Sequence, residues 1–163
     1  MAINVRAVEA DEIDHLARVW HEGWNDAHGK IAPEGLVQAR TLESFRARLA
    51  ILDDTRVIGP VGAPLGLCII KDDELHQLFV ARAARGTGVA AALLADGEAR
   101  LAARGFATVW LACAIGNDRA ARFYEKCGWV MAGEVANRLE TQAGVFEIKI
   151  WRYEKAVGAE TAR

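Results

Sequence analysis

A short segment with two glycines, Arg85-Gly86-Thr87-Gly88-Val89-Ala90, marks the point where the hydrophobic pattern of the chain changes. Before it, Glu74–Val80 has the length and composition of a strand. After it, apolar residues recur at helical spacing from Val89 to about Arg104. Glycine has no Cβ, so the backbone can turn sharply here and a ligand can approach it closely. The segment therefore predicts a tight strand-to-helix turn, in a fold where helices pack on a sheet.

The elements on either side of this turn have a mixed order of strands and helices. Short Gly, Pro and Asp turns before residue 80 predict antiparallel hairpins, and the apolar run Thr108–Ala114 predicts a central strand covered on both faces. We expect helices from Asp11, after Thr41, from Val89 and after the capping residue Asn117. The expected strands are Ile3–Val8, Arg56–Val61, Leu65–Lys71, Glu74–Val80, Thr108–Ala114, Trp129–Arg138 and Val145–Tyr153.

Composition and charge narrow the class of protein. The chain has 163 residues, of which 52% are hydrophobic and 26% charged, as expected for one globular domain. Its net charge of −2 gives no basic field for binding nucleic acid. The cysteines, Cys68, Cys113 and Cys127, form neither a disulfide framework nor a zinc pattern. We expect one domain over residues 1–153, a loose tail over 154–163, no metal, no membrane partner and a cytoplasmic location.

The glycine turn is itself a candidate phosphate site. The first N–H groups of a helix lack intrahelical partners and lie at the positive end of its dipole, and Arg85 adds a cation. A plain turn would have the same sequence. Gly86-x-Gly88-x-x-Ala91 also matches a dinucleotide fingerprint. However, the next strand ends at Ala114 without the acid that such a site requires.

A second motif runs from Asn117 to Trp129 and, taken alone, predicts a capped amphipathic helix. Together the two motifs resemble those of the GNAT superfamily of acetyl-CoA-dependent N-acetyltransferases. The resemblance covers about residues 3–153 and is strongest over 74–129. The matching residues of the first motif are Arg85, Gly88 and Ala90, and those of the second are Asn117, Ala120, Phe123, Tyr124, Gly128 and Trp129.

This resemblance implies a fold and a cofactor site. The fold would be α/β (α+β), with a mixed, mostly antiparallel sheet of about six to seven strands flanked by about four helices. Acetyl-CoA would be the co-substrate. Its pyrophosphate would bind the turn residues Arg85, Gly86, Thr87, Gly88, Val89 and Ala90. Its pantetheine arm would pair with the backbone of Leu78, Phe79 and Val80. Asn117 would contact the pantetheine or nearby backbone.

The same resemblance suggests roles in acetyl transfer. Tyr124 would reach the thioester sulfur, and its phenol, protonated at neutral pH, would act as a general acid. A backbone N–H near Phe79 or Val80 would meet the developing oxyanion. Glu74, His76 or a water path would serve as the base. In a regular strand Glu74, His76 and Leu78 share one face, and Leu75, Gln77 and Phe79 share the other.

The amine acceptor is less defined, and a small molecule or a peptide would fit. The helix and loop expected to face the acceptor contain Trp20 and Trp24, which we expect in the core, and acids such as Asp26 that could meet a cationic amine. Because many family members pair, the resemblance implies a homodimer. Two other functions stay open, a non-catalytic acyl-CoA-binding module and a dinucleotide-dependent oxidoreductase.

Overall fold

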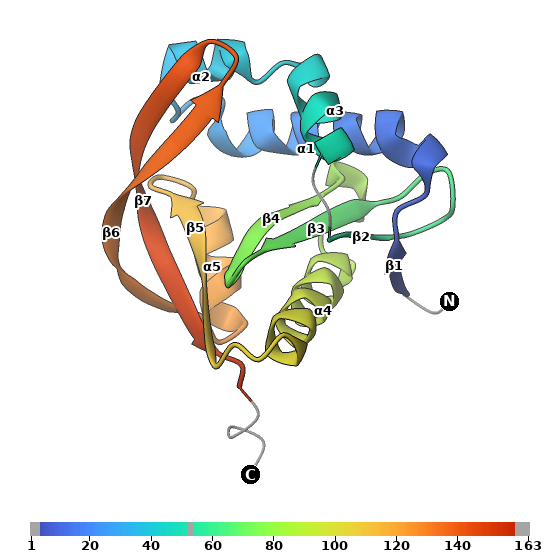
Figure 1. Cartoon of the computed structure of the whole chain (residues 1–163), viewed down its shortest axis with the longest axis vertical. Coiled ribbons are helices and arrows are strands. Elements are labelled where there is room, and N and C mark those ends of the chain that lie inside the picture. Colours follow the sequence, from blue (N-terminus) through green and yellow to red (C-terminus); the bar gives the residue numbers. More distant parts are fainter. Residues whose placement is uncertain (1–3, 52–53, 159–163) are drawn as a thin grey trace.

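Seven strands form one sheet in the order β1-β2-β3-β4-β5-β7-β6, with helices on both faces (Figure 1). The computed structural model describes residues 4–51 and 54–158. The fold class is confirmed: the sheet is mostly antiparallel, with four long helices. The elements are β1 Val5–Ala7, η1 Ala10–Glu12, α1 Ile13–His28, α2 Glu34–Ala39, α3 Leu42–Ile51, β2 Thr55–Ile58, β3 Gly66–Lys71, β4 Glu74–Val80, η2 Arg82–Ala84, α4 Val89–Ala103, β5 Thr108–Ala114, α5 Asp118–Lys126, β6 Val130–Thr141 and β7 Gly144–Ala156.

The strands Glu74–Val80 and Thr108–Ala114 have their predicted bounds, whereas other elements differ at their ends. The strand expected to reach Val61 ends at Ile58, and the one expected to end at Arg138 continues to Thr141. Ile3, the expected start of the first strand, lies outside the described residues. The helix expected from Asp11 begins at Ile13, after the short turn η1. Helix α2 is not among the helices expected from the sequence: the carbonyl of Pro33 accepts hydrogen bonds from the N–H groups of Leu36 and Val37 and so starts a helical turn. Proline has no N–H to lose at such a position.

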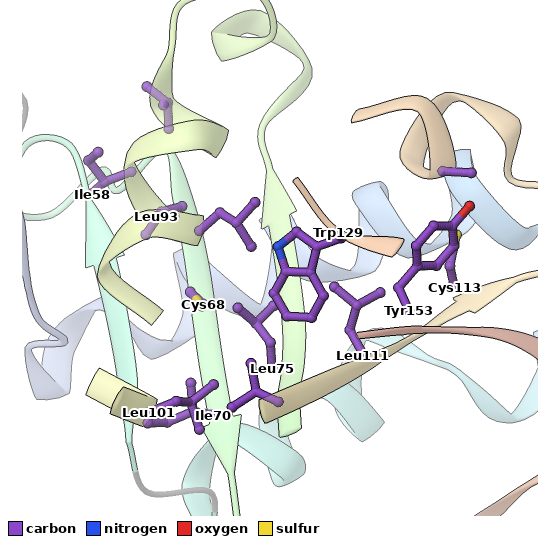
Figure 2. Packing of buried hydrophobic residues seen from close by; sticks show 14 of the residues in the cluster. Ile58, Cys68, Ile70, Leu75, Leu93, Leu101, Leu111, Cys113, Trp129 and Tyr153 are labelled. Carbon is purple, nitrogen blue, oxygen red and sulfur yellow. The ribbon is translucent and has the colours of Figure 1, made fainter. Parts of the chain in front are cut away.

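Two hydrophobic cores lie on opposite faces of the sheet. Helices α1, α2 and α3 cover β2 and β3 on one face. Helices α4 and α5 cover the other face, where Trp129 packs beside Leu75 and Leu111 and joins the two halves of the sheet (Figure 2). Gly97 lets α4 approach closely, since a Cβ there would lie 3.0 Å from Cys68 Sγ and from Leu75 Cδ1. In the described part of the chain, no helix is long and apolar enough to cross a membrane.

Strand β5 is covered less completely than its apolar sequence predicted. Val109, Leu111 and Cys113 are buried in the α4 and α5 core, whereas the alternate residues Trp110 and Ala112 are only half-buried. The expectation of a strand covered on both faces is therefore wrong. Helices α1 to α3 pack on β2, β3 and β4 and do not extend over β5, which leaves room beside it on that face.

The carboxyl-terminal boundary also differs from the expectation. Strand β7 continues to Ala156, which pairs with Thr108. The N–H groups of Val157 and Gly158 both donate to the carbonyl of Ala107. Residues 154–158 are thus tied to the sheet, and the expected loose tail does not begin at 154. Residues 159–163 lie outside the described part of the chain.

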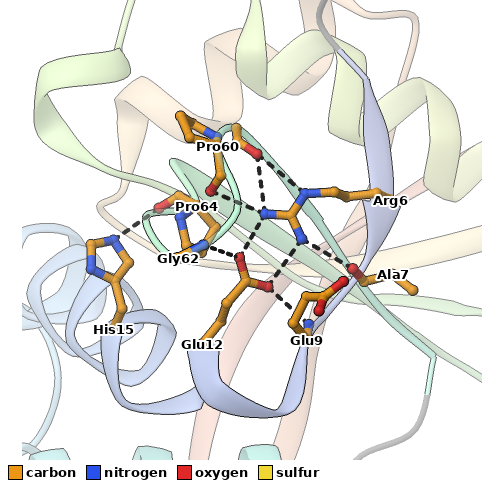
Figure 3. Close-up of polar contacts among 9 residues, drawn as sticks. Arg6, Ala7, Glu9, Glu12, His15, Pro60, Gly62 and Pro64 are labelled. Atoms are coloured by element: carbon orange, nitrogen blue, oxygen red, sulfur yellow. Dashed lines mark hydrogen bonds and ion pairs between the residues drawn. The ribbon is translucent and has the colours of Figure 1, made fainter.

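A polar network ties β1 and η1 to the turn between β2 and β3 (Figure 3). The fully buried carboxylate of Glu12 accepts two hydrogen bonds from the Arg6 guanidinium, at 2.6 and 3.0 Å. It also accepts from the N–H groups of Glu9 and Gly62, at 2.8 and 2.9 Å. Because the charged form is so well bonded, the pKa of Glu12 is lowered to about 2, with the Arg6 hydrogen bond as the largest cause.

Candidate active site

Strands β4 and β5 form the one parallel contact among the strand pairs of the described chain, at Glu74 and Trp110. Beyond it, residues of both strands line cavities, so the strands have separated. Successive strand residues direct their backbone groups to opposite edges. The Ala81 N–H bonds the Leu65 carbonyl next to β3, so Leu78 and Val80 direct N–H groups toward the gap. This favours Leu78 or Val80, rather than Phe79, as the oxyanion donor.

The first cavity, which we call the glycine-turn cleft, lies between β4, the start of α4 and α5. Its volume is about 330 Å³. Of the residues predicted to bind the cofactor, it brings together Leu78, Phe79, Val80, Arg85, Gly86, Gly88, Ala90, Asn117 and Tyr124. It does not include Thr87 or Val89. The Thr87 hydroxyl donates a hydrogen bond to the Ala84 carbonyl, and the Val89 side chain is buried in the core. Only the backbone of these two residues is therefore left to contact a ligand at the turn.

The turn itself has the geometry that its sequence predicted. Gly86 and Gly88 have φ angles of +78° and +90°, which disfavour other residues, and Gly88 is the N-cap of α4. In the described structure, the N–H groups from Gly86 to Ala90 make no backbone hydrogen bond of good geometry. These free donors at a helix N-terminus fit a phosphate group.

Arg85 has a partner that the sequence did not indicate. Asp26 of α1 forms ion pairs with Arg82 at 2.6 Å and with Arg85 at 3.2 Å. The hydrogen bond from Arg82 is the largest cause of the lowered pKa of Asp26. Asp26 therefore lies beside the glycine turn and holds its cations, which corrects the suggestion that it meets a cationic amine.

Tyr124 lines both this cleft and a second cavity. Its ring lies against Phe123, Trp129 and Tyr153, with centroids 5.5 to 6.3 Å apart, so the side chain is held by core packing. Burial raises the pKa of its phenol, which stays protonated at neutral pH. Among the described residues, its hydroxyl has no hydrogen-bond partner. Such a phenol is free to donate a proton to a ligand.

Asn117 has a structural role that agrees with its predicted place. Its side-chain oxygen accepts a hydrogen bond of 3.4 Å from the Ala120 N–H and so caps α5. Both Asn117 and Ala120 line the two cavities. The cap therefore fixes the helix that carries Tyr124 at the edge of the gap.

Strand β4 contains a bulge, which overturns the expected pattern of its faces. Gln77 pairs with Ile69 and Leu75 with Ile70, so His76 is an extra residue without a partner on β3. Leu75 and Leu78 consequently lie in the same core, and the predicted alternation is wrong. Glu74 and His76 both line the second cavity, with 3.3 Å between Glu74 Oε1 and His76 Nδ1. Both candidate bases therefore stay close together despite the irregular strand.

The second cavity, which we call the arginine cavity, has a volume of about 210 Å³. It lies beside the uncovered face of β5 and reaches Arg40 at the end of α2 and Arg48 of α3. Sequence reasoning missed both arginines, because the helix that ends at Arg40 was not expected and no motif marks either residue. Trp20 and Trp24 are buried, as expected, and Trp24 also lines this cavity.

The hairpin of β6 and β7 forms one wall of the arginine cavity through Asn137, Leu139, Ile148, Lys149 and Ile150. This hairpin extends toward α2 (Figure 1). Gln142 at its turn donates a hydrogen bond of 2.8 Å to the Ala39 carbonyl. His28 of α1 lies on another side of the cavity, and burial lowers its pKa to about 4, so its imidazole is neutral at pH 7.

Solved structures share this architecture. A GCN5-related N-acetyltransferase from Rhodopseudomonas palustris is similar with a TM-score of 0.73 and 19% identity, over 96% of this chain and 98% of the other. An N-acetyltransferase from Thermoplasma acidophilum, solved in complex with coenzyme A, is similar with a TM-score of 0.67 and 18% identity, over 96% and 99%.

Sequence comparison is more specific. Uncharacterized N-acetyltransferases of Mycobacterium bovis and Mycobacterium tuberculosis are 37% identical over 97 residues, which are 58% of this chain and 59% of each relative. The match thus spans under two thirds of these relatives. The model of the acetyltransferase (GNAT) family matches residues 11–129, which contain both motifs and the strands of the gap. This chain belongs to the acetyltransferase (GNAT) family.

Proposed function

We propose that this protein transfers an acetyl group from acetyl-CoA to a primary amine, by direct attack in a ternary complex. The observation that carries the proposal is the meeting of two cavities at Tyr124. One has free N–H donors at a helix start, which suit a pyrophosphate. The other is lined by two candidate bases, Glu74 and His76. A donor and an acceptor could thus enter from different sides and meet beside one phenol.

The residues present fit acetyl-CoA, which supplies an activated acetyl group as a thioester. Gly86, Gly88 and Ala90 would bind its pyrophosphate with backbone N–H groups, and Arg85 would add a cation that Asp26 now holds. The outward backbone groups of Leu78 and Val80 would hold its extended arm. Their N–H groups also provide the oxyanion donors.

Glu74, beside His76, would take a proton from the ammonium form of the acceptor, directly or through water. The neutral amine then forms a C–N bond to the acetyl carbon, and the C–S bond breaks with its electron pair on sulfur. Tyr124 donates a proton to that sulfur and is reprotonated from solvent. After attack the nitrogen loses a second proton to water, and this proton balances the one that sulfur gains. The proton taken by Glu74 is released to solvent, so an ammonium and a thioester become an amide, a thiol and one proton.

Thermal melting with acetyl-CoA, NADH and NADPH tests the ligand. A ligand at about 100 times its Kd adds about 2.7 kcal/mol, which corresponds to a melting shift of roughly 5–10 °C. We expect a shift with acetyl-CoA alone, followed by amine-dependent release of free thiol. A shift without thiol release across a broad amine panel would indicate a non-catalytic acyl-CoA-binding module. A shift with a nicotinamide cofactor alone would overturn the proposal.

Two substitutions test the roles. Tyr124→Phe should lower kcat about 100-fold, the usual scale for loss of a general acid, while the melting shift with acetyl-CoA persists. Glu74→Gln should lower kcat on a similar scale if Glu74 is the base, and His76→Gln is its matched comparison. Unchanged turnover in Tyr124→Phe would remove this residue from the mechanism. The homodimer and the cytoplasmic location stay predictions.

A further inference from the structure

The arginine cavity contains a buried cation that nothing in the described protein neutralises. The Arg40 side chain is only 6% exposed, and its buried Nε has no hydrogen-bond partner. In the described part of the chain, Arg40 has no ion pair and its side chain makes no hydrogen bond. Burying an unpaired guanidinium costs several kcal/mol, so proteins rarely keep one without a partner. An anion that enters the cavity would offset this cost by pairing with the Arg40 guanidinium.

The surroundings of Arg40 add to its positive charge. Arg48 lines the same cavity, also without an ion pair among the described residues, and Lys149 lines it from β7. The Arg48 guanidinium lies over the Trp20 ring, 4.4 Å from its centroid, which orients it without neutralising it. Burial and the charge of Arg40 lower the pKa of Arg48 to about 9, so Arg48 remains a cation at neutral pH.

The cavity also separates the two signs of charge. Of the described residues that line it, Glu74 alone carries a carboxylate, and it comes from β4, whereas the arginines come from α2 and α3. Arg40 and Arg48 do not line the glycine-turn cleft, so they are not part of the predicted pyrophosphate site. The lining thus provides the Glu74 carboxylate for an ammonium group, and the planar guanidinium groups of Arg40 and Arg48 for an anion.

We propose that the acceptor is a small amine that also carries a carboxylate or phosphate group, which Arg40 and Arg48 bind. This inference rests on the proposed acetyl transfer and specifies its acceptor class. The cavity volume of about 210 Å³ lies below the range of roughly 300–1,000 Å³ for pockets that hold drug-sized ligands, which favours a compact acceptor. The anion orients the amine toward Glu74 and Tyr124.

The test compares acceptors that differ only in the anion. Amino acids are measured against their carboxamides, and O-phosphoethanolamine against ethanolamine, by thiol release from acetyl-CoA. Each hydrogen bond to a charged group is worth about 10- to 100-fold in affinity. We expect kcat/KM to be at least about 10-fold higher for an anionic member than for its neutral counterpart. The two series distinguish carboxylate from phosphate as the anion.

Variants of Arg40 assign the effect to this cavity. Arg40→Gln should lower kcat/KM about 10- to 100-fold for the anionic acceptor and change it little for the neutral one. For the anionic acceptor, Arg40→Lys should have a kcat/KM between those of wild type and Arg40→Gln, because lysine keeps the charge but lacks the planar guanidinium donors. Arg46→Gln is the matched control, because Arg46 lies on the same helix as Arg48 but pairs with Asp14 at the surface. It should leave kcat/KM unchanged for both the anionic and the neutral acceptor.

Binding provides a second readout that does not depend on turnover. With coenzyme A present, N-acetyl amino acids should raise the melting temperature more than their carboxamides do, and Arg40→Gln should abolish that difference. If neither transfer nor melting favours the anionic compounds, the inference is overturned. If acetyl-CoA gives no melting shift at all, the proposed function fails instead. A normal acetyl-CoA shift in Arg40→Gln separates the two results and shows that the variant folds.

Discussion

Glu12 and Arg40 are the two buried residues with a formal charge in the described part of the chain, and their surroundings are opposite. The Glu12 carboxylate accepts hydrogen bonds from Arg6 and from two backbone N–H groups (Figure 3). Arg40 has no such partner and lines a cavity. The difference teaches that the Glu12 charge stabilises the folded protein, whereas the Arg40 charge is available to bind an anionic ligand.

The largest expected effect is the loss of the Glu12 carboxylate. Glu12→Ala leaves the Arg6 guanidinium and the N–H groups of Glu9 and Gly62 without their shared acceptor. Breaking a buried pair in this way costs about 3–5 kcal/mol of unfolding free energy, which urea denaturation measures. Asp14→Ala is the control, because Asp14 pairs with Arg46 at the surface and should cost under about 1 kcal/mol. Equal losses in the two variants would contradict the assignment.

Acid should weaken the same contact in the wild-type protein. The pKa of Glu12 is lowered from 4.5 to about 2, so its contribution is complete above the unfolded value and disappears as the pH falls from about 4.5 to about 2. The shift corresponds to about 3 kcal/mol. Glu12→Gln should therefore show a flatter loss of stability in this window, although Asp26, whose pKa is also lowered, titrates in both proteins. A parallel pH profile would be the contrary result.

Removing the Arg40 charge should not lower the stability of the protein, in contrast to removing the Glu12 carboxylate. Arg40→Met deletes an unpaired buried charge and keeps much of its volume, so the ligand-free protein should be as stable as wild type or more stable by about 1 kcal/mol. Urea unfolding without ligand checks this. A loss on the scale expected for Glu12→Ala would show that Arg40 supports the fold, and would break the contrast between the two sites.

The smallest effect concerns an arginine at the surface. Arg46→Gln removes ion pairs to the exposed carboxylates of Asp14 and Glu43. Such pairs contribute little in water, and the unfolding free energy should change by less than about 1 kcal/mol. Raising the salt concentration in the wild-type protein should reproduce much of this small change. A large loss would mean that these pairs, and not burial, decide which arginines stabilise the protein.

Much of the fold could be predicted because its signals are local. The strand Thr108–Ala114 has its predicted bounds, and the helix Asp118–Lys126 begins directly after the predicted cap Asn117. Gly128, with φ at +93°, follows the end of this helix. The tight turn lies where the glycines predicted it, and both Gly86 and Gly88 have positive φ angles there. Helix α2 was missed because a short helix started by the Pro33 carbonyl leaves no periodic pattern.

The candidate site was predicted where a motif marks it. Tyr124, Asn117 and most of the turn residues meet in one cleft. The sequence could not show the bulge at His76, because a register shift depends on the partner strand. Nor could it show that Asp26 holds Arg85, since that contact joins residues distant in the chain.

The sequence by itself determined the element order, the glycine turn and the helix that carries Tyr124, because glycine conformation and helix capping act over a few residues. Only the tertiary structure decided which charges are satisfied. Arg6 and Arg40 are the same residue type in the sequence, but their surroundings differ. Arg6 pairs with Glu12, whereas Arg40 follows the last residue of α2 and lines a cavity. The desolvation that makes Arg40 informative depends on what packs around it, and this is a property of the whole fold.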